Sequence, residues 1–205
     1  MPTRDFSLRR IYLSAVKMIL DFTVSLALII LLFPLLLLFS LVLLVHFQRS
    51  PFFIQKRIGK GGSTFPLIKF RTLGVDGDHQ SVSRFGKILR VTSVDELPQL
   101  INILRGEMSF VGPRPLLPEY QEFYTIDEKR RHSVKPGLTG LTQLTFGNSP
   151  DWDKRMNSDI YYVEKVSFWV DLKLLLQTVF VLFNFKKKSN LDKEIERFDD
   201  FAKHR

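Results

Sequence analysis

The feature that most restricts the fold of this chain is an apolar run from Phe22 to Val45 that contains no charged residue. As a helix rising about 1.5 Å per residue, the run reaches roughly 36 Å, which is enough to cross a bilayer. It is too long and too rich in leucine for a cleaved signal peptide, and no small-residue cleavage site follows it. We therefore expect a membrane helix that the mature protein retains.

Two features of this run argue against a simple crossing. Pro34 lies near the middle, where it removes a backbone hydrogen bond and clashes with the preceding turn, so a kink or break is expected near Phe33. Basic residues flank both ends, and the positive-inside rule places both flanks in the cytoplasm. A re-entrant helix that turns at Pro34 and leaves on the side it entered satisfies both features. An ordinary kinked span is the alternative.

The rest of the 205 residues is enough for one folded core. We expect a membrane-embedded segment over residues 1–48, a folded domain over 49–188 and a charged tail over 189–205. A formal charge of +9 points to an anionic partner, which is a phospholipid surface, nucleic acid or a phosphorylated substrate. The chain has no cysteine, so disulfides and thiolate metal sites are excluded.

Three segments beyond the apolar run carry secondary-structure signals. Two β-prone runs, 52–58 and 65–70, are joined by a glycine-rich turn and predict a hairpin, because the glycines lack the spacing of a phosphate loop. Apolar residues at helical spacing surround Pro98 and stop at Gly106, so a helix is expected to begin around Asp95. Residues 166–188 favour an interfacial helix with a basic end, with a buried core helix as the alternative.

Asp95 and Glu96 are adjacent acidic residues at the expected start of that helix. Their simplest explanation is capping, because acidic residues stabilise a helix N-terminus. The same position stabilises an ionised carboxylate, so Asp95 is expected to be charged at neutral pH and able to act as a nucleophile or metal ligand. Both explanations stay open from these two residues alone.

Basic residues lie in four short motifs around the acidic pair. Pro113 and Pro115 restrict the backbone on both sides of Arg114, and a rigidly held guanidinium suits bidentate phosphate recognition. Scattered basic side chains also occur on solvated or lipid-facing surfaces, which is the alternative. The motifs are LIKFRT, ILRVTS, VGPRP and KPGLTG, which carry Lys69, Arg71, Arg90, Arg114 and Lys135.

Taken together, KFRT, LRVTSVDELPQLINILRGEMSFVGPRPLLPEY and RRHSVKPGLTG resemble the bacterial sugar transferase family, the monotopic polyprenyl-phosphate phosphoglycosyl transferases. The likeness covers nearly the whole chain and matches a short family form. It implies an α/β membrane-associated fold, with a re-entrant hydrophobic helix broken at Pro34 and a small mixed α/β catalytic domain with interfacial amphipathic helices. The resemblance places that domain on the cytoplasmic face of the bacterial inner membrane.

The resemblance also implies a reaction. The Asp of the acidic pair, here Asp95, attacks the β-phosphate of a UDP-sugar, releases UMP and carries the phosphosugar until a polyprenyl phosphate accepts it. The family requires Mg²⁺, for which Asp95 is the expected ligand, and Glu96 assists proton transfer or metal placement. The expected substrate-binding set is Lys69, Arg71, Arg90, Pro113, Arg114, Lys135 and a downstream acid, Asp159.

The expected partners are a UDP-sugar, polyprenyl phosphate and membrane phospholipid, with a homodimer left open. Nucleic acid is not expected, because the basic residues form no known binding motif and a long membrane segment is present. The competing function is a non-catalytic membrane adaptor that holds anionic lipid. The chain departs from the family after KPGLTG, where LTFGNSPDW lacks an Arg near Phe146. This departure leaves the identity of the sugar open.

Overall fold

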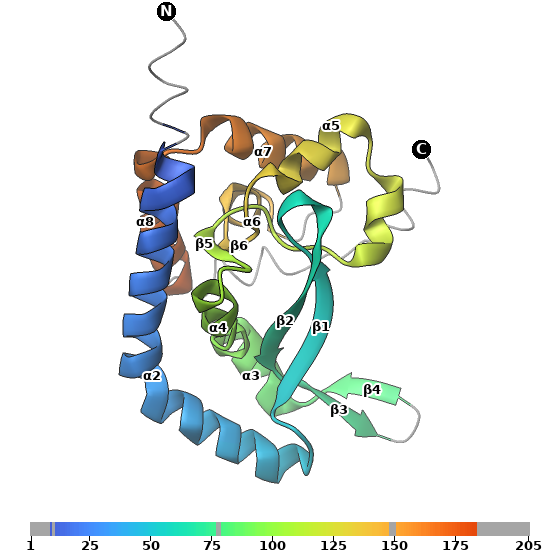
Figure 1. Cartoon of the computed structure of the whole chain (residues 1–205). Coiled ribbons are helices and arrows are strands. Elements are labelled where there is room, and N and C mark those ends of the chain that lie inside the picture. Colours follow the sequence, from blue (N-terminus) through green and yellow to red (C-terminus); the bar gives the residue numbers. More distant parts are fainter. Residues whose placement is uncertain (1–8, 10, 77–78, 148–150, 184–205) are drawn as a thin grey trace, which may run out of the picture.

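The computed structural model describes residues 9, 11–76, 79–147 and 151–183 (Figure 1). A π-helical turn, η1 (Tyr12–Val16), continues directly into the long helix α2 (Lys17–Phe47). Within the described residues, the stretch Tyr12–Phe47 is the one helix long and apolar enough to cross a membrane. The predicted long apolar helix is therefore present, and its retention in the mature protein stays a prediction. The charged tail predicted over 189–205 lies outside the described residues.

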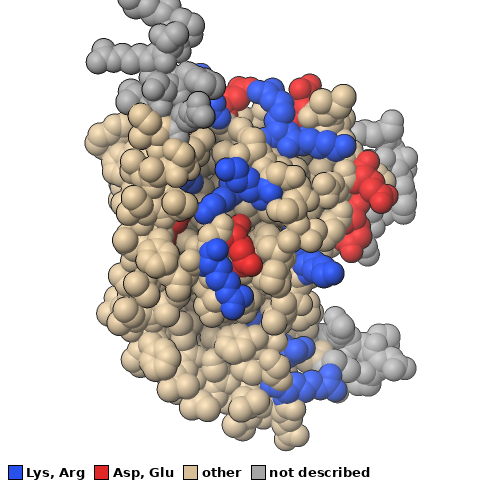
Figure 2. Space-filling model, in the orientation of Figure 1, with Lys and Arg blue, Asp and Glu red and all other residues tan. Residues whose placement is uncertain are grey.

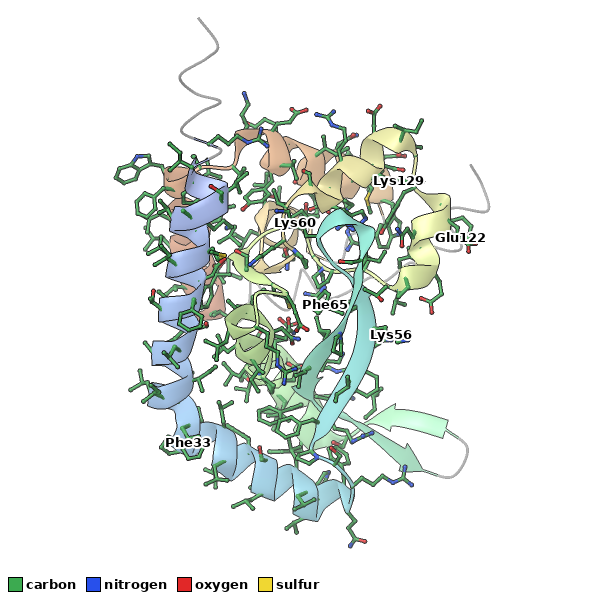
Figure 3. All side chains as sticks on the ribbon, viewed as in Figure 1. Phe33, Lys56, Lys60, Phe65, Glu122 and Lys129 are labelled. Carbon is green, nitrogen blue, oxygen red and sulfur yellow. The ribbon has the colours of Figure 1, made fainter. Side chains whose placement is uncertain are left out.

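Helix α2 remains helical through Pro34 and changes direction close to Phe33, as Figures 1 and 3 show. A proline inside a helix removes one hydrogen bond and pushes away the preceding turn, which accounts for a bend at this place. The expected break is thus a bend within a continuous helix. The sheets and most of the other helices lie in the angle between its two halves (Figure 1). The re-entrant path through a bilayer stays a prediction.

The concave face of α2 packs against the domain, and its outer face does not. Before the bend, Leu28, Ile29 and Leu32 cover one buried cluster of the domain, and beyond the bend Leu43 is fully buried in another. The outer face exposes many large apolar side chains, among them Leu31, Phe33, Leu41 and Val45. An exposed apolar surface of this extent indicates contact with lipid or with another protein.

The strands of the described residues form three two-stranded sheets. β1 (Phe52–Ile58) pairs antiparallel with β2 (Thr64–Phe70), β3 (Leu73–Asp76) antiparallel with β4 (His79–Val82), and β5 (Ser109–Val111) parallel with β6 (Gly137–Thr139). The first hairpin confirms the prediction for 52–58 and 65–70. Its turn contains η2 (Lys60–Gly62), where Gly61 and Gly62 take positive φ angles of 70° and 79° that favour glycine.

The remaining helices are short, apart from the last two, and the mixed α/β class is confirmed. In chain order they are α3 (Arg84–Thr92), η3 (Val94–Glu96), α4 (Gln99–Leu104), η4 (Pro118–Phe123), α5 (Ile126–Lys129), η5 (Arg130–Ser133), α6 (Leu141–Thr145), α7 (Trp152–Lys165) and α8 (Phe168–Phe183). The helix expected from Asp95 begins at Gln99 instead. A separate 3₁₀ turn, η3, holds the acidic pair.

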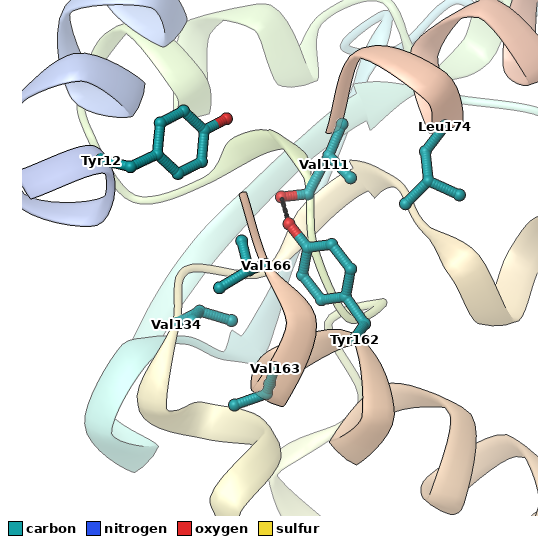
Figure 4. Packing of buried hydrophobic residues seen from close by; sticks show 7 residues of the cluster. All are labelled: Tyr12, Val111, Val134, Tyr162, Val163, Val166 and Leu174. Carbon is teal, nitrogen blue, oxygen red and sulfur yellow. Dashed lines mark hydrogen bonds between the residues drawn. The ribbon is translucent and has the colours of Figure 1, made fainter. Parts of the chain in front are cut away.

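Helix α8 lies beside the N-terminal end of the long helix and has two different faces. Its buried Asp171 accepts hydrogen bonds from the hydroxyls of Tyr12 (2.6 Å) and Tyr162 (2.7 Å) and forms an ion pair with Lys17. The Tyr162 hydroxyl also lies 3.1 Å from the carbonyl oxygen of Val111 (Figure 4). The other face exposes Trp169, Leu176 and Phe180. This face fits an interfacial helix, which stays a prediction, and the lysines predicted at its end lie outside the described residues.

Candidate active site

The acidic pair lies in a tight turn between two helices. α3 ends at Ser93, which has a φ of 58°, and η3 follows at once with Asp95 and Glu96. A residue other than glycine in this left-handed region costs on the order of 1 kcal/mol, and such positions cluster at functional sites. No side-chain hydrogen bond caps η3 or α4. The structure therefore does not support capping as the role of Asp95.

The side chain of Asn102 holds α4, and with it the acidic turn, against β2. Its Oδ1 accepts from the backbone N–H of Ile68 (3.0 Å), and its Nδ2 donates to the carbonyl of Pro66 (2.8 Å). Asn102 is fully buried, so these bonds satisfy strand-edge groups that would otherwise be costly to bury. The same strand carries Lys69, which brings an ammonium group close to Asp95.

Asp95 is only 7% exposed and lies among several charged groups. Burial raises its pKa to about 6, and the negative charge of Glu96 adds to this rise. Three cations oppose the rise and lower the pKa: Lys69, Arg90 and Arg114. A helix N-terminus would lower the pKa of Asp95, so the rise is opposite to the shift expected from capping. At neutral pH the carboxylate is still mostly ionised. Asp95 is thus a buried anion among cations that come from β2, α3 and the loop after β5.

Arg57 is a site residue that sequence reasoning missed. Burial lowers the pKa of its guanidinium to about 10, with the neighbouring charge of Arg114 as the second cause. Its Nη2 donates to Gln55 Oε1 (2.8 Å), but its buried Nε has no partner among the described residues. Two guanidinium groups in each other's field are stabilised when an anion binds both. The pairing of β1 with β2 could have revealed Arg57. Arg57 lies opposite the core residue Phe65, so the two side chains point to the same face of the hairpin.

Arg114 links the acidic pair to a buried ion pair behind it. Its exposed guanidinium donates to Glu96 Oε1 at 3.1 Å, and its carbonyl oxygen accepts from Arg131 Nη2 at 2.8 Å. Arg131 in turn contacts Asp159 at 2.6 Å and 3.0 Å. Prolines on both sides and this hydrogen bond together fix the Arg114 backbone. Arg131 is a second residue that sequence reasoning missed, although it lies in the quoted RRHS segment.

Asp159 does not lie at the surface of the site. It is 4% exposed and accepts hydrogen bonds from Arg131 and from the Thr142 hydroxyl (2.6 Å). A buried carboxylate needs such compensation, and here the bonds supply it. The structure connects Asp159 to Arg114 through Arg131, so its nearest contacts suit positioning rather than direct contact with a substrate.

The other predicted binding residues are placed in different surroundings. Arg90 Nε donates to Thr72 Oγ1 at 2.9 Å, beside the acidic turn. Arg71 Nε donates to the carbonyl of Ser50 at 2.9 Å and so braces the start of β1. Lys135 lines a pocket against α2, together with Asp21 and Lys60. Lys69, Arg90 and Arg114 are therefore the predicted basic residues whose charges act on Asp95.

Glycines bring the Arg114 and Lys135 motifs together. A Cβ atom on Gly137 would lie 2.1 Å from the backbone nitrogen of Gly112, and one on Gly112 would lie 2.4 Å from the carbonyl oxygen of Lys135. No side chain fits at such distances, so the two backbones meet only because both residues are glycine. VGPRP and KPGLTG are thus two halves of one packed unit, and Pro113 lies in it next to Arg114.

Comparison with known proteins identifies the family of this chain. The family model described as Bacterial sugar transferase matches residues 12–185. A UDP-glucose:undecaprenyl-phosphate glucose-1-phosphate transferase from Caulobacter vibrioides is 38% identical over 191 residues, covering 84% of this chain and 71% of that protein. The uncharacterized sugar transferase EpsL of Bacillus subtilis is 44% identical over 136 residues, covering 62% of this chain and 67% of that protein.

Longer relatives match over a smaller share of their length. A UDP-N-acetylgalactosamine-undecaprenyl-phosphate N-acetylgalactosaminephosphotransferase from Aeromonas hydrophila is 32% identical over 166 residues, which cover 71% of this chain but 38% of that protein. The family match spans every element from η1 to α8 and so includes the site. The chain therefore belongs to the bacterial sugar transferase family.

Proposed function

We propose that this enzyme transfers a sugar 1-phosphate from a UDP-sugar to a polyprenyl phosphate such as undecaprenyl phosphate. The products would be a polyprenyl diphosphate sugar, which begins a bacterial surface glycan, and UMP. The observation that carries the proposal is Asp95, a buried and ionisable carboxylate to which the described residues donate no side-chain hydrogen bond. The names of the Caulobacter and Aeromonas relatives specify the same type of reaction for those proteins.

The proposed reaction has two displacements at one phosphorus atom. A carboxylate oxygen of Asp95 attacks the β-phosphorus of the UDP-sugar, the bond to the oxygen that bridges the two phosphates breaks, and UMP leaves with that oxygen. A phosphate oxygen of the polyprenyl phosphate then attacks the same phosphorus, and the carboxylate of Asp95 leaves. Arg57, Lys69 and Arg114 are the groups that would stabilise the extra negative charge on the phosphoryl oxygens.

The site has a donor set that fits Mg²⁺ when substrate is bound. Within the described residues no three His, Cys, Asp or Glu side chains gather at one point, so this part of the chain offers no complete cage. Mg²⁺ is usually held by one or two carboxylates together with substrate phosphates and water. Asp95 and Glu96 would supply the carboxylates, and the ion would neutralise phosphate charge. Glu96 would place the ion or move a proton.

The membrane arrangement we propose is a re-entrant one in the inner membrane, with the domain on the cytoplasmic face. The outer face of the bent α2 is apolar, and Figure 2 shows few charged side chains along that edge of the molecule. Basic residues flank the apolar run on both sides, which favours a cytoplasmic location for both of its ends. The alternative adaptor function would use this basic surface but gives no reason to bury Asp95.

Topology can be tested with single cysteines, because the chain has none of its own. One cysteine replaces Ser63 in the hairpin turn and another replaces Thr3, which lies outside the described residues. An impermeant thiol reagent added to the periplasmic side should label neither variant in intact spheroplast-derived vesicles. Labelling at position 3 would show that the helix crosses the membrane.

The transfer itself is tested with purified protein, Mg²⁺, undecaprenyl phosphate and a panel of UDP-sugars, including glucose, galactose and their N-acetylated and deoxyamino relatives. We expect release of UMP, and not UDP, with at least one sugar, together with a lipid-linked diphosphate sugar. Release of UDP would indicate transfer of the sugar alone and would contradict the proposal. The matched control is Asp127→Asn, an exposed acidic residue on α5, which should leave activity unchanged.

A further inference from the structure

A basic pocket lies at the junction of α2 with the domain. It has a volume of about 40 Å³ and is lined chiefly by Leu13, Lys17, Met18, Asp21, Lys60 and Lys135. A water molecule needs roughly 10–15 Å³, so the space is large enough for a small polar group such as a phosphate. Lys60 comes from the hairpin turn, close to the middle of the face in Figure 3, and Lys135 from the segment before β6.

The three lysines around this pocket differ in the partners they have. Lys17 is already committed to Asp171 and to the carbonyl of Val111 (3.0 Å). Burial lowers the pKa of Lys135, the Asp21 carboxylate opposes this shift, and the like charge of Lys60 lowers the pKa further. An anion between these two ammonium groups would relieve their repulsion. Figure 2 shows Lys and Arg side chains at several places on this face, with acidic side chains among those near its middle.

Asp21 adds a second and different requirement. Its Oδ1 accepts from the Ser109 hydroxyl and from the backbone N–H of Phe110, both at 3.1 Å. Its Oδ2 is buried and has no partner among the described residues, although the side chain lines the pocket and the residue is 6% exposed. An unpaired buried oxygen of this kind is costly. A ligand that fits the pocket therefore brings a hydrogen-bond donor as well as an anion.

The pocket also lies at the level where a membrane surface is expected. Two of its walls, Leu13 and Met18, belong to the helix whose outer face is apolar, and Met18 is exposed. One turn away, Tyr12 contacts Phe168 edge to face, and the neighbouring Trp169 is 75% exposed. Exposed aromatic residues beside an apolar helix mark the interface between acyl chains and headgroups. Acyl chains could therefore leave the pocket along α2.

From these observations we infer that the pocket binds the headgroup of one phospholipid whose phosphodiester carries a further O–H or N–H donor. The phosphate lies between Lys60 and Lys135, the donor reaches Asp21 Oδ2, and the acyl chains follow Leu13 on η1 and Met18 on α2. Phosphatidylglycerol and phosphatidylethanolamine meet both requirements. Phosphatidylcholine has the phosphate but no donor. The bound lipid would fix the height of the N-terminal half of α2 at the membrane surface.

The test measures lipid binding by native mass spectrometry of the full chain after delipidation in detergent. Phosphatidylglycerol and phosphatidylethanolamine should each bind at one site, and phosphatidylcholine of the same chain length about ten-fold more weakly, because Asp21 stays unpaired. Lys60→Gln should weaken the first two about ten-fold. Lys56→Gln is the matched control, since Lys56 is likewise an exposed lysine but lies on β1 outside the pocket.

A second variant tests the donor requirement without relying on affinity alone. Asp21→Asn provides its own N–H, so the preference for phosphatidylglycerol over phosphatidylcholine should shrink within that variant. The inference is overturned by equal binding of phosphatidylcholine to the wild type, or by equal losses in Lys56→Gln and Lys60→Gln. It is overturned as well by displacement of lipid by equimolar glycerol 3-phosphate, which would reveal a free phosphate site. If Lys60→Gln raises the KM for undecaprenyl phosphate but leaves phospholipid binding intact, the pocket belongs to the acceptor instead.

Discussion

Asp95 and Asp159 are the same residue type at similar burial, but their surroundings differ. Asp159 receives two hydrogen bonds from the Arg131 guanidinium and one from Thr142. Asp95 receives no side-chain hydrogen bond from the described residues, and its burial and the charge of Glu96 are opposed only by the fields of Lys69, Arg90 and Arg114. A carboxylate compensated on all sides is fixed in place. A carboxylate held among cations without such bonds keeps its oxygens for a substrate.

The surroundings of Asp159 support the turn that carries Asp95. The Arg131–Asp159 pair is almost inaccessible and holds the carbonyl of Arg114. Arg114 in turn contacts Glu96 through an exposed ion pair, which is weak by itself. The buried Arg131–Asp159 pair therefore fixes the backbone of Arg114, which two prolines also restrict. The acidic turn is held in place in this way although Asp95 carries a buried charge that costs stability.

The largest effect is expected from Asp95→Asn. Turnover should fall by more than about 1,000-fold, as is usual when a nucleophile is removed. The free energy of unfolding should rise by about 1–3 kcal/mol at pH 7, because the amide carries no desolvated charge. In the wild type the cost of burying the charged carboxylate lowers the free energy of unfolding by its full amount above the folded pKa of about 6. This cost disappears as the pH falls toward 3.8, the ordinary pKa of an aspartate. UMP release and denaturant unfolding in detergent measure the two effects, and a destabilised variant would assign Asp95 a structural role.

Asp159→Asn should show the opposite pattern. Removing one partner of a buried ion pair leaves Arg131 uncompensated and should lower the free energy of unfolding by about 3–5 kcal/mol. The double variant Asp159→Leu with Arg131→Met should recover part of this loss, since neither charge is then buried alone. Thermal unfolding at pH 7 provides the measurement. Equal stability of Asp159→Asn and the wild type would remove the distinction between the two aspartates.

Arg114→Lys should have a smaller effect on turnover, about 10- to 100-fold, with little change in stability. Lysine keeps the charge but loses the planar fork that binds two phosphate oxygens at once. The matched control is Arg130→Lys, which changes an arginine in an exposed ion pair with Glu164 and should be nearly neutral. Near-normal turnover of Arg114→Lys would reduce Arg114 to a surface role.

The smallest expected effect is a shift in the pH profile. The value of kcat/KM for the UDP-sugar should fall as the pH drops through about 6, because the neutral carboxyl group of Asp95 is not a nucleophile. Glu96→Gln removes a negative neighbour and should move this limb to lower pH. Lys69→Met removes a cation and should move it to higher pH. An acid limb near pH 4 in the wild type would show that Asp95 is not the titrating group.

Sequence reasoning predicted the bend of the apolar helix and the first hairpin, because each depends on a local signal, Pro34 or a glycine turn. The basic residues around Asp95 lie on separate segments, and the resemblance to the family is what grouped them. Sequence reasoning placed the helix start at Asp95, whereas tertiary packing inserted the separate turn η3 before Gln99. It also missed Arg57 and Arg131. Their importance depends on contacts between distant segments, such as Arg131 with Arg114 and Asp159, which no periodicity reveals.

The central claim, that Asp95 is the nucleophile, is tested most directly by mixing the enzyme with Mg²⁺ and a UDP-sugar without any polyprenyl phosphate. We expect a burst of UMP close to one equivalent per active site, and mass spectrometry of the quenched protein should locate a phosphosugar on the peptide that contains Asp95. Asp95→Asn should show neither the burst nor the adduct. An adduct on Glu96, or UMP release only when both substrates are present, would contradict the claim.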